Sequence, residues 1–136
     1  MNTIFEKIIS HEIPAEIFYE DEYVIAFLDI KPVNKGHTLV VPKRAFENIF
    51  DAPKEDLLRM IEVAQKIAIA LKETLNVEGV NIIMNNGSVA GQEIFHAHMH
   101  VIPRIPDDGF YLTPPVATYG ENEMPEMAAR LKDAIG

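Results

Sequence analysis

The segment from residue 51 to residue 75 constrains the fold most, because it carries one long apolar periodicity of the helical kind. Apolar residues recur there every three or four positions over about five turns, which predicts a helix that buries one face. Asp51 can cap its first turn, which holds Pro53, and Gly79 lies just past its end. The periodic positions are Leu57, Ile61, Ala64, Ala68, Leu71 and Leu75.

The other apolar runs are short and β-like, and they flank this helix on both sides. Three precede it, at 17–20, 23–30 and 37–42, and two follow it, at 80–86 and 93–103. Short helices are predicted at 3–9 and, capped by Asn122, at 123–136. This order predicts an α+β fold: an antiparallel five-stranded sheet with one long central helix and short terminal helices. We expect a single domain over residues 1–136, with a motif-bearing core at about 3–104 and a C-terminal tail at 105–136.

The charge balance and the absence of cysteine limit the possible partners. The chain has 21 acidic and 12 basic residues and a formal net charge of −9, so neither nucleic acid nor a membrane surface is expected as a partner. Without cysteine there is no disulfide and no thiolate metal site, which fits the cytoplasmic location that we expect. The longest apolar runs are too short to span a bilayer, and Glu6 and Lys7 interrupt the N-terminal stretch.

Three of the five histidines alternate along the last predicted strand, at His96, His98 and His100. Side chains two positions apart on a strand point to the same face, about 6.5–7 Å from one another. The three imidazoles are therefore expected on one face, turned toward a cleft or solvent. The opposite, core-facing side is expected to hold Phe95, Ala97, Met99 and Val101.

Three hypotheses account for this cluster. It can be a solvated polar face, a metal site with His37 as a fourth ligand, or a nucleophile that attacks phosphorus. Two imidazolium charges this close repel by roughly 2.4 kcal/mol at an effective dielectric near 20, so the rings favour the neutral state until an anion binds. A bound phosphate then favours charging one ring, which can supply the proton for a leaving group.

The loop before the histidines suits phosphate oxygens. It offers the side-chain amides of Asn85, Asn86 and Gln92 and backbone N–H groups at Gly87 and Gly91. The same residues also suit an ordinary turn, so this loop alone leaves the choice open.

Together these features resemble the histidine triad (HIT) family of nucleotide hydrolases and transferases, in its bacterial, Hint-like branch. The family motif is His-φ-His-φ-His-φ-φ, where φ is apolar, and HAHMHVI at residues 96–102 fits every position. The family's Gly-Gln pair stands at Gly91 and Gln92, and residues 3–43 resemble its N-terminal half almost throughout. The resemblance covers roughly residues 3–104 and implies the histidine triad fold.

The resemblance also implies roles for individual residues. His98 would be the nucleophile that forms a covalent nucleotidyl-histidine intermediate, while His96 and His100 would orient it and bind phosphate. His37 would be the family's fourth histidine, near the triad, and Asp29 would accept hydrogen bonds from the ribose hydroxyls. The other nucleotide-binding residues would be Ile4, Phe5, Ile8, Phe27 and Ile30 around the base, and Asn85, Gly91 and Gln92 on the phosphate side.

The chain departs from the family pattern at two places. Many relatives carry a small hydroxyl residue after the Gly-Gln pair, where this chain has Glu93, whose ionised carboxylate cannot donate to phosphate. Some bacterial relatives hold a structural zinc at positions that are Thr3, Glu6 and Ala45 here, so no metal and no cofactor is expected.

The function implied by the resemblance is hydrolysis at the α-phosphate of a purine nucleotide. The substrates would be nucleoside phosphoramidates or dinucleoside polyphosphates, and the product would be nucleoside monophosphate. The resemblance also implies a homodimer with a continuous sheet, in which the helix from Asp51 is placed to serve the interface. The alternative is a nucleotide-binding regulatory or interaction module with little turnover.

Overall fold

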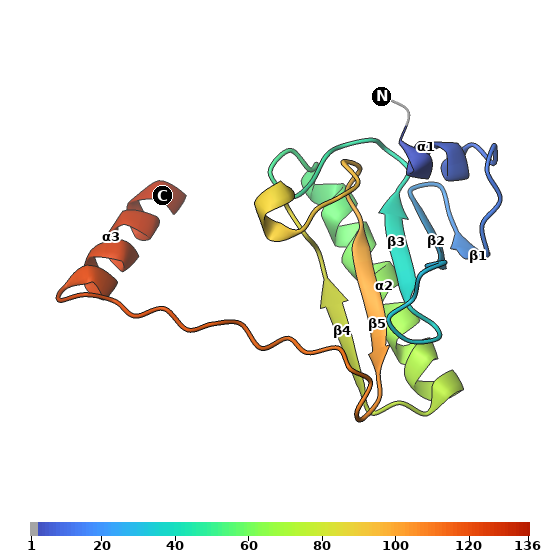
Figure 1. Ribbon diagram of the computed structural model, residues 1–136. Helices are drawn as coiled ribbons and strands as arrows, with labels where there is room; N and C mark the ends of the chain where they lie inside the picture. The colour runs from blue at the N-terminus through green and yellow to red at the C-terminus, as the bar shows by residue number, and fades with distance from the viewer. Residues whose placement is uncertain (1–2) are drawn as a thin grey trace.

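A computed structural model describes residues 3–136 and shows a five-stranded sheet with a long helix against it (Figure 1). Neighbouring strands are antiparallel throughout, in the spatial order β1-β2-β3-β5-β4, so the predicted α+β fold is confirmed. The elements in chain order are α1 (Ile4–Ile9), β1 (Ile17–Glu20), β2 (Val24–Leu28), β3 (Thr38–Pro42), α2 (Lys54–Leu75), β4 (Gly79–Ile83), the 3-10 turn η1 (Ser88–Ala90), β5 (Met99–Arg104) and α3 (Glu123–Ile135).

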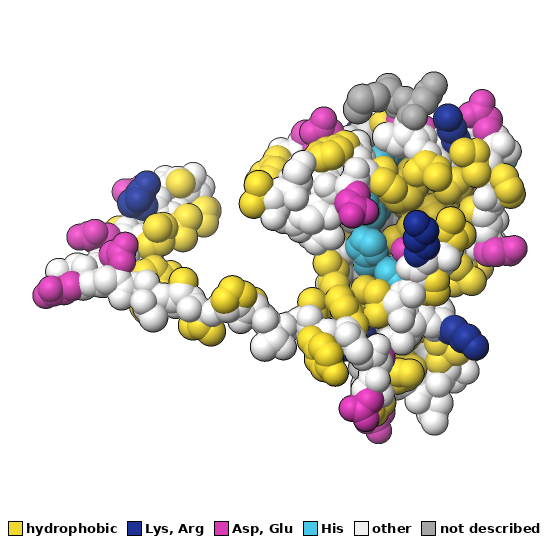
Figure 2. All heavy atoms as spheres, viewed as in Figure 1, with side chains coloured by type: hydrophobic (Ala, Val, Ile, Leu, Met, Phe, Trp, Pro, Cys, Tyr) yellow, Lys and Arg dark blue, Asp and Glu magenta, His cyan; other side chains and the backbone are white. Residues whose placement is uncertain are grey.

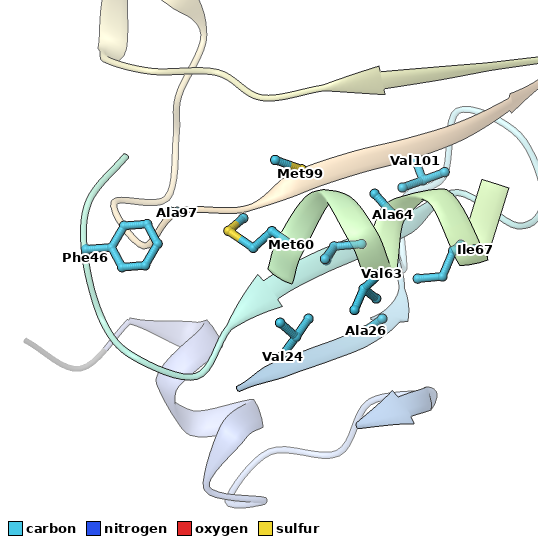
Figure 3. Close-up of a cluster of buried hydrophobic side chains, with 11 residues drawn as sticks. Val24, Ala26, Phe46, Met60, Val63, Ala64, Ile67, Ala97, Met99 and Val101 are labelled. Atoms are coloured by element: carbon cyan, nitrogen blue, oxygen red, sulfur yellow. The ribbon is translucent and has the colours of Figure 1, made fainter. Parts of the chain in front are cut away.

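α2 covers one face of the sheet, and the main hydrophobic core lies between the two layers (Figure 3). Ala97, Met99 and Val101 belong to this core, as the alternation predicted, whereas Phe95 is only half-buried. Each fully buried side chain of this size contributes about 1.5–3 kcal/mol, so this layer fixes the orientation of β5. The buried members are Val24, Ala26, Val40, Phe46, Met60, Val63, Ala64, Ile67, Ala97, Met99 and Val101.

The buried face of α2 differs in part from the predicted one. Met60, Val63 and Ile67 are buried, while Ile61 and Leu75 are exposed. Apolar residues occur on more than one side of this helix, so periodicity alone could not select the side that the sheet covers. The remaining predicted positions Leu57, Ala64, Ala68 and Leu71 do lie in or against the core.

The expected cap of α2 was wrong. The helix begins at Lys54, and Pro53 occupies the N-cap position without a side-chain hydrogen bond. Asp51 instead accepts hydrogen bonds from the backbone N–H groups of Glu47, at 3.1 Å, and Asn48, at 3.0 Å. Its carboxylate therefore stabilises the preceding loop, a use of aspartate that competes with capping.

The last strand is shorter than predicted, because β5 begins only at Met99. Its pairing with β3 runs from Val101 opposite Thr38 to Met99 opposite Val40, so Ala97 falls opposite Pro42. Proline has no N–H to donate, and the ladder with β3 stops before it. His96 and His98 therefore lie in the segment before the strand, where the chain bends at residues 94–96, and only His100 lies within the strand.

α1 covers part of the other face of the sheet. Its capping box joins Thr3 and Glu6, and its Phe5 and Ile8 are buried in a second hydrophobic cluster with residues of β2 and β3. The buried members of that cluster are Phe5, Ile8, Ile25, Phe27, Leu39 and Val41. Among residues 3–136, no helix is both long enough and apolar enough to cross a membrane.

Candidate functional site

A pocket opens beside α1, on the face of the sheet opposite α2. Its volume of about 570 Å³ is within the range of small-molecule sites. Figure 2 shows histidine side chains at the surface here, beside a broad area of hydrophobic side chains. The pocket is lined by Ile4, Phe5, Ile8, Ile13, Pro14, Ala15, Phe27, Leu28, Asp29, Ile30, Lys31, Leu39, Asn85, Gly91, Glu93, Ile94, His98 and His100.

Most of the residues singled out from the sequence meet at this pocket. The predicted residues that line it are Ile4, Phe5, Ile8, Phe27, Asp29, Ile30, Asn85, Gly91, His98 and His100. Three others, His37, His96 and Gln92, are buried behind its wall. The first group can contact a ligand directly, and the second can act only through its neighbours.

His98 is held in one tautomer. Its Nδ1 lies 2.8 Å from the backbone oxygen of His96, and a carbonyl can only accept, so Nδ1 carries the proton. In a neutral ring the lone pair is then on Nε2. The edge-to-face contact of Phe5, with ring centroids 4.9 Å apart, further fixes the plane of this imidazole. This arrangement leaves a nitrogen with a free lone pair on a side chain that lines the pocket.

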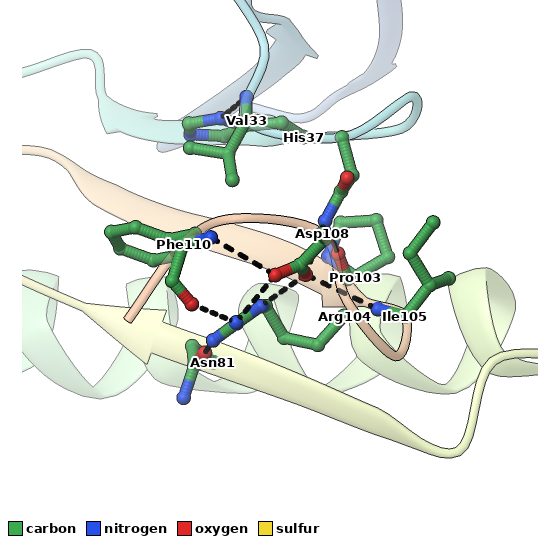
Figure 4. A network of polar contacts seen from close by, with 9 residues as sticks. Val33, His37, Asn81, Pro103, Arg104, Ile105, Asp108 and Phe110 are labelled. Carbon is green, nitrogen blue, oxygen red and sulfur yellow. Dashed lines mark hydrogen bonds and ion pairs between the residues drawn. The ribbon is translucent and has the colours of Figure 1, made fainter. Parts of the chain in front are cut away.

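His37 and His100 form a second chain of hydrogen bonds. The turn at Gly36, where φ is +100°, brings His37 to the start of β3. There the Val33 N–H donates to His37 Nδ1 at 3.1 Å, a contact drawn in Figure 4. A neutral His37 must therefore carry its proton on Nε2, which lies 2.9 Å from His100 Nδ1. His100 then has its own proton on Nε2, available as a donor to a bound ligand.

His96 does not line the pocket. It is 1% exposed, and its Nε2 lies 2.7 Å from the backbone oxygen of Pro42, to which it donates. Its Nδ1 is buried with no hydrogen-bond partner among the described residues. The side chain ties the segment before β5 to the end of β3, and its backbone oxygen fixes His98. The structure thus places His96 where it orients His98, away from the expected phosphate contact.

Burial keeps the four histidines of the site, His37, His96, His98 and His100, neutral near pH 7. It is the main cause that lowers the pKa of His37, His96 and His98 below the usual value. Burial lowers the pKa of His100 to about 4, and the proximity of His98 and His37, whose protonated rings would repel a charge on His100, adds to this. The nearby Asp29 carboxylate opposes this effect at His37, 3.6 Å away, without reversing it. A neutral His98 is the state that can attack an electrophile.

One group of side chains within residues 3–136 has the composition of a metal site. It comprises Asp29, His37 and His100, whose ligand atoms all lie within 4.8 Å of one another. Ligation requires a lone pair on His37 Nε2, but the Val33 N–H at Nδ1 places the proton on Nε2. The hydrogen bonds of this cluster therefore fit a proton relay better than a metal ion.

Gln92 was expected on the phosphate side but is turned away from the pocket. Its amide oxygen accepts from Asn48 Nδ2 at 3.1 Å and from the Gly87 N–H at 2.9 Å. Its amide nitrogen donates to the backbone oxygens of Glu47, at 2.7 Å, and Ile94, at 3.0 Å. With its amide fully bonded, Gln92 holds the loop that carries Asn85, Gly91 and Glu93 at the pocket.

Lys31 was not predicted at the site, yet it lines the pocket together with Asp29. Its backbone N–H also donates to Asp29 Oδ1 at 2.9 Å, which orients that carboxylate. The signal was its position two residues after Asp29, in the turn that leads to His37. Asp29, Lys31 and Glu93 are the charged residues among those that line the pocket, so charge complementarity with a ligand depends on them.

Comparisons with known proteins show to which family this chain and its fold belong. The family model of the HIT domain matches residues 10–107. An uncharacterized HIT-like protein of Methanocaldococcus jannaschii is 47% identical over 98% of this chain and 98% of its own. A HIT family protein from Bacillus anthracis superimposes at a TM-score of 0.92, with 40% identity over 99% of this chain and 98% of its own. A histidine triad nucleotide-binding protein from Candida albicans superimposes at a TM-score of 0.89, with 30% identity over 98% of this chain and 97% of its own.

Proposed function

The chain belongs to the HIT family, and we propose that it is a nucleotide-binding hydrolase that acts at the α-phosphate of purine nucleoside phosphoramidates or dinucleoside polyphosphates. The observation that carries the proposal is the fixed tautomer of His98, a pocket residue whose lone pair is on Nε2 and whose ring lies 5.1 Å, between centroids, from that of His100. A nucleophile and a proton donor are thus available at one site.

In the proposed reaction, His98 Nε2 attacks the α-phosphorus and the bond to the leaving group breaks. His98 then carries the nucleotidyl group on Nε2 and keeps its proton on Nδ1, so the positive charge faces the His96 carbonyl at 2.8 Å. Phosphate charge favours protonation of the His37–His100 pair, which gives the leaving group its proton through His100 Nε2. Water next attacks phosphorus, gives its proton to the now neutral His37–His100 pair, breaks the Nε2–P bond and releases nucleoside monophosphate.

The rest of the pocket suits a nucleoside. The apolar side chains of Ile4, Phe5, Ile8, Phe27 and Ile30 line the pocket and offer a slot for the base. Asp29 lines the same pocket, with its carboxylate within 4.8 Å of ring nitrogens of His37 and His100. Asn85 and Gly91 are available to the phosphate. Gln92 supports their loop and is not proposed as a ligand contact.

Replacement of Asp29 by alanine should weaken nucleotide binding by roughly 1.5–3 kcal/mol, the range for hydrogen bonds to a charged group. The carboxylate is at the pocket, oriented by the Lys31 N–H, and suits acceptance from ribose hydroxyls. Calorimetry with a ribonucleotide and its 2′,3′-dideoxy analogue measures this directly. The dideoxy ligand should bind the wild type and the Asp29→Ala variant equally well, and equal losses for the two ligands would exclude the ribose contact.

Glu93 should set the choice of leaving group. Its carboxylate lines the pocket close in sequence to Gly91 and repels an anionic polyphosphate more than a neutral or cationic amine. We therefore expect phosphoramidates to be the better substrates. Glu93→Gln should raise kcat/KM for a dinucleoside polyphosphate by about tenfold, since roughly 1.4 kcal/mol of repulsion is lost.

A turnover assay with adenosine and guanosine phosphoramidates and with dinucleoside polyphosphates tests both the reaction and this preference. Lys31→Gln is the matched control, because it removes the opposite charge from the same pocket and should not favour the polyphosphate. An unchanged substrate ratio in Glu93→Gln would remove the residue from selection. Tight nucleotide binding with no turnover of any of these substrates would instead indicate a binding module.

The proposed enzyme is a homodimer. β4 is the last strand of the sheet and has a free edge, on which Ile82 is exposed. The outer side of α2 also exposes Leu58, Ile61 and Ile69. An unpaired strand edge beside exposed apolar residues favours association with a second copy, which would extend the sheet and cover α2.

A further inference from the structure

Phe5 contacts both the apolar slot for the base and the histidines. It belongs to α1, lines the pocket and is only 3% exposed. Its ring lies edge-to-face against Phe27 of the slot, with centroids 5.8 Å apart, and against His98, with centroids 4.9 Å apart. One side chain therefore joins the part of the pocket that suits a base to the proposed nucleophile.

The direction of the His98 lone pair depends on the rings that pack against it. The hydrogen bond from Nδ1 to the His96 oxygen fixes the tautomer of His98. A single hydrogen bond leaves the ring able to pivot, because the last side-chain torsion of histidine is broad. Phe5 and His100 are the aromatic neighbours of this ring, and Phe5 also lies edge-to-face against His96, at 6.0 Å between centroids. Phe5 thus limits the tilt of His98 and supports the segment that carries it.

The backbone of Phe5 is held firmly by α1. Thr3 and Glu6 form a capping box at the first turn, and Ile8 anchors the next turn in the same hydrophobic cluster as Phe5. Protein groups cover nearly all of the Phe5 side chain, and it lines the pocket with the remainder. A base in the slot would cover that remainder, and a ring packed on every side has no room to tilt.

We propose that Phe5 is a positioning residue, through which a base bound in the slot holds His98 in line with the α-phosphorus. The inference rests on the proposed hydrolysis and gives the base slot a second task, the alignment of the nucleophile. Binding energy used for alignment raises kcat, whereas a base that only adds affinity lowers KM. A displacement of a reacting atom by about 1 Å can cost about 10²-fold in rate, so a modest tilt of the His98 ring is enough.

Substrates with and without a base test the proposal in steady-state kinetics. The kcat of wild-type protein for an adenosine phosphoramidate should exceed that for the corresponding ribose 5-phosphoramidate by about 10- to 100-fold. Phe5→Leu keeps the slot apolar but removes the ring. In this variant kcat for the adenosine substrate should fall by the same factor, and the advantage of the base in kcat should disappear.

Phe27→Leu is the matched variant. Phe27 is also 3% exposed, lines the same pocket and belongs to the same cluster, but among residues 3–136 no ring contact joins it to a histidine. This variant should raise KM for the adenosine substrate, yet most of the kcat advantage of the base should remain. Survival of that advantage in Phe5→Leu, or its equal loss in both variants, would overturn the proposal. Thermal unfolding checks that both variants are folded at the assay temperature.

A spectroscopic readout separates this inference from the hydrolysis. Adenosine has no phosphate, so it reports on the slot alone. At saturation it should shift the imidazole signals of His98 in the nuclear magnetic resonance spectrum of the wild type, and shift them much less in Phe5→Leu. The exposed His11 outside the site gives the reference signal. Equal shifts in the two proteins would exclude coupling through Phe5. Coupled shifts in a wild type that hydrolyses none of the substrates would refute the hydrolysis and support the coupling.

Discussion

His98→Asn should lower kcat by at least about 10⁴-fold, because the asparagine amide has no lone pair able to displace a leaving group from phosphorus. Nucleotide affinity should change little. The base slot and Asp29 are untouched, and asparagine is polar and branches at the same atom as histidine, so the segment before β5 can keep its place. Steady-state kinetics with a phosphoramidate, paired with calorimetry, measures the two quantities.

His96→Asn and His100→Asn are the comparison variants, and each should cost less, in the range of about 10²–10⁴-fold. His96 acts through the backbone of its own segment and through Pro42, and His100 supplies one donor to the phosphate side. A His98→Asn protein that retains turnover, or that is less impaired than His100→Asn, would contradict the assignment of the nucleophile.

Stability should fall steeply as the pH is lowered from about 6.5 to 5. His37, His96, His98 and His100 have lowered pKa values in the folded protein, with His100 at about 4, while the ordinary value applies after unfolding. In this window the unfolded chain binds protons that the folded chain does not, so acid favours unfolding. Each histidine contributes a slope of up to about 1.4 kcal/mol per pH unit, and this stability is fully present above pH 6.5.

Denaturant unfolding at pH 8, 6.5, 5.8 and 5 measures this slope before most carboxylates titrate. His100→Gln should reduce the slope, because it removes one of the buried imidazoles. His11→Gln is the matched control and should leave it unchanged, since His11 is exposed and lies outside the cluster. A free energy of unfolding that is flat from pH 8 to 5 would show that the four rings are not kept neutral by burial.

The predicted architecture depended on the helical and β-like periods of the sequence, and the structure has a long helix and five strands where these periods occur. The single helical periodicity between runs of β-like sequence was enough for the α+β sheet and its long helix, since each element has a distinct period. The alternation at residues 96–101 also predicted which side faces the core, because Ala97, Met99 and Val101 are apolar and the histidines are not.

The errors arose where one residue had two possible partners. Asp51 has the chemistry of a helix cap, yet the nearer N–H groups of the preceding loop take its carboxylate. Gln92 could have faced phosphate, but four protein groups satisfy its amide. The start of β5 depended on Pro42 in a strand distant in sequence, a constraint that appears only once the register is known.

The site was recognisable from its residue types, but its chemistry was not. A list of histidines is compatible with a metal site, a polar surface or a nucleophile. The choice depends on which nitrogen bears a proton, and this follows from two backbone groups, the Val33 N–H and the His96 carbonyl. Those contacts are set by tertiary structure, so only the fold gives the proton positions on which the proposed nucleophile and relay depend.

The most direct test of the account is the site of covalent attachment. Wild-type protein is mixed with a nucleoside phosphoramidate labelled at the α-phosphate, quenched within milliseconds in base, and mapped by peptide mass spectrometry. The account predicts a base-stable, acid-labile label on His98, which accumulates before the first turnover and is absent from His98→Asn. A label on His96 or His100, or rapid turnover without any labelled histidine, would contradict the central claim.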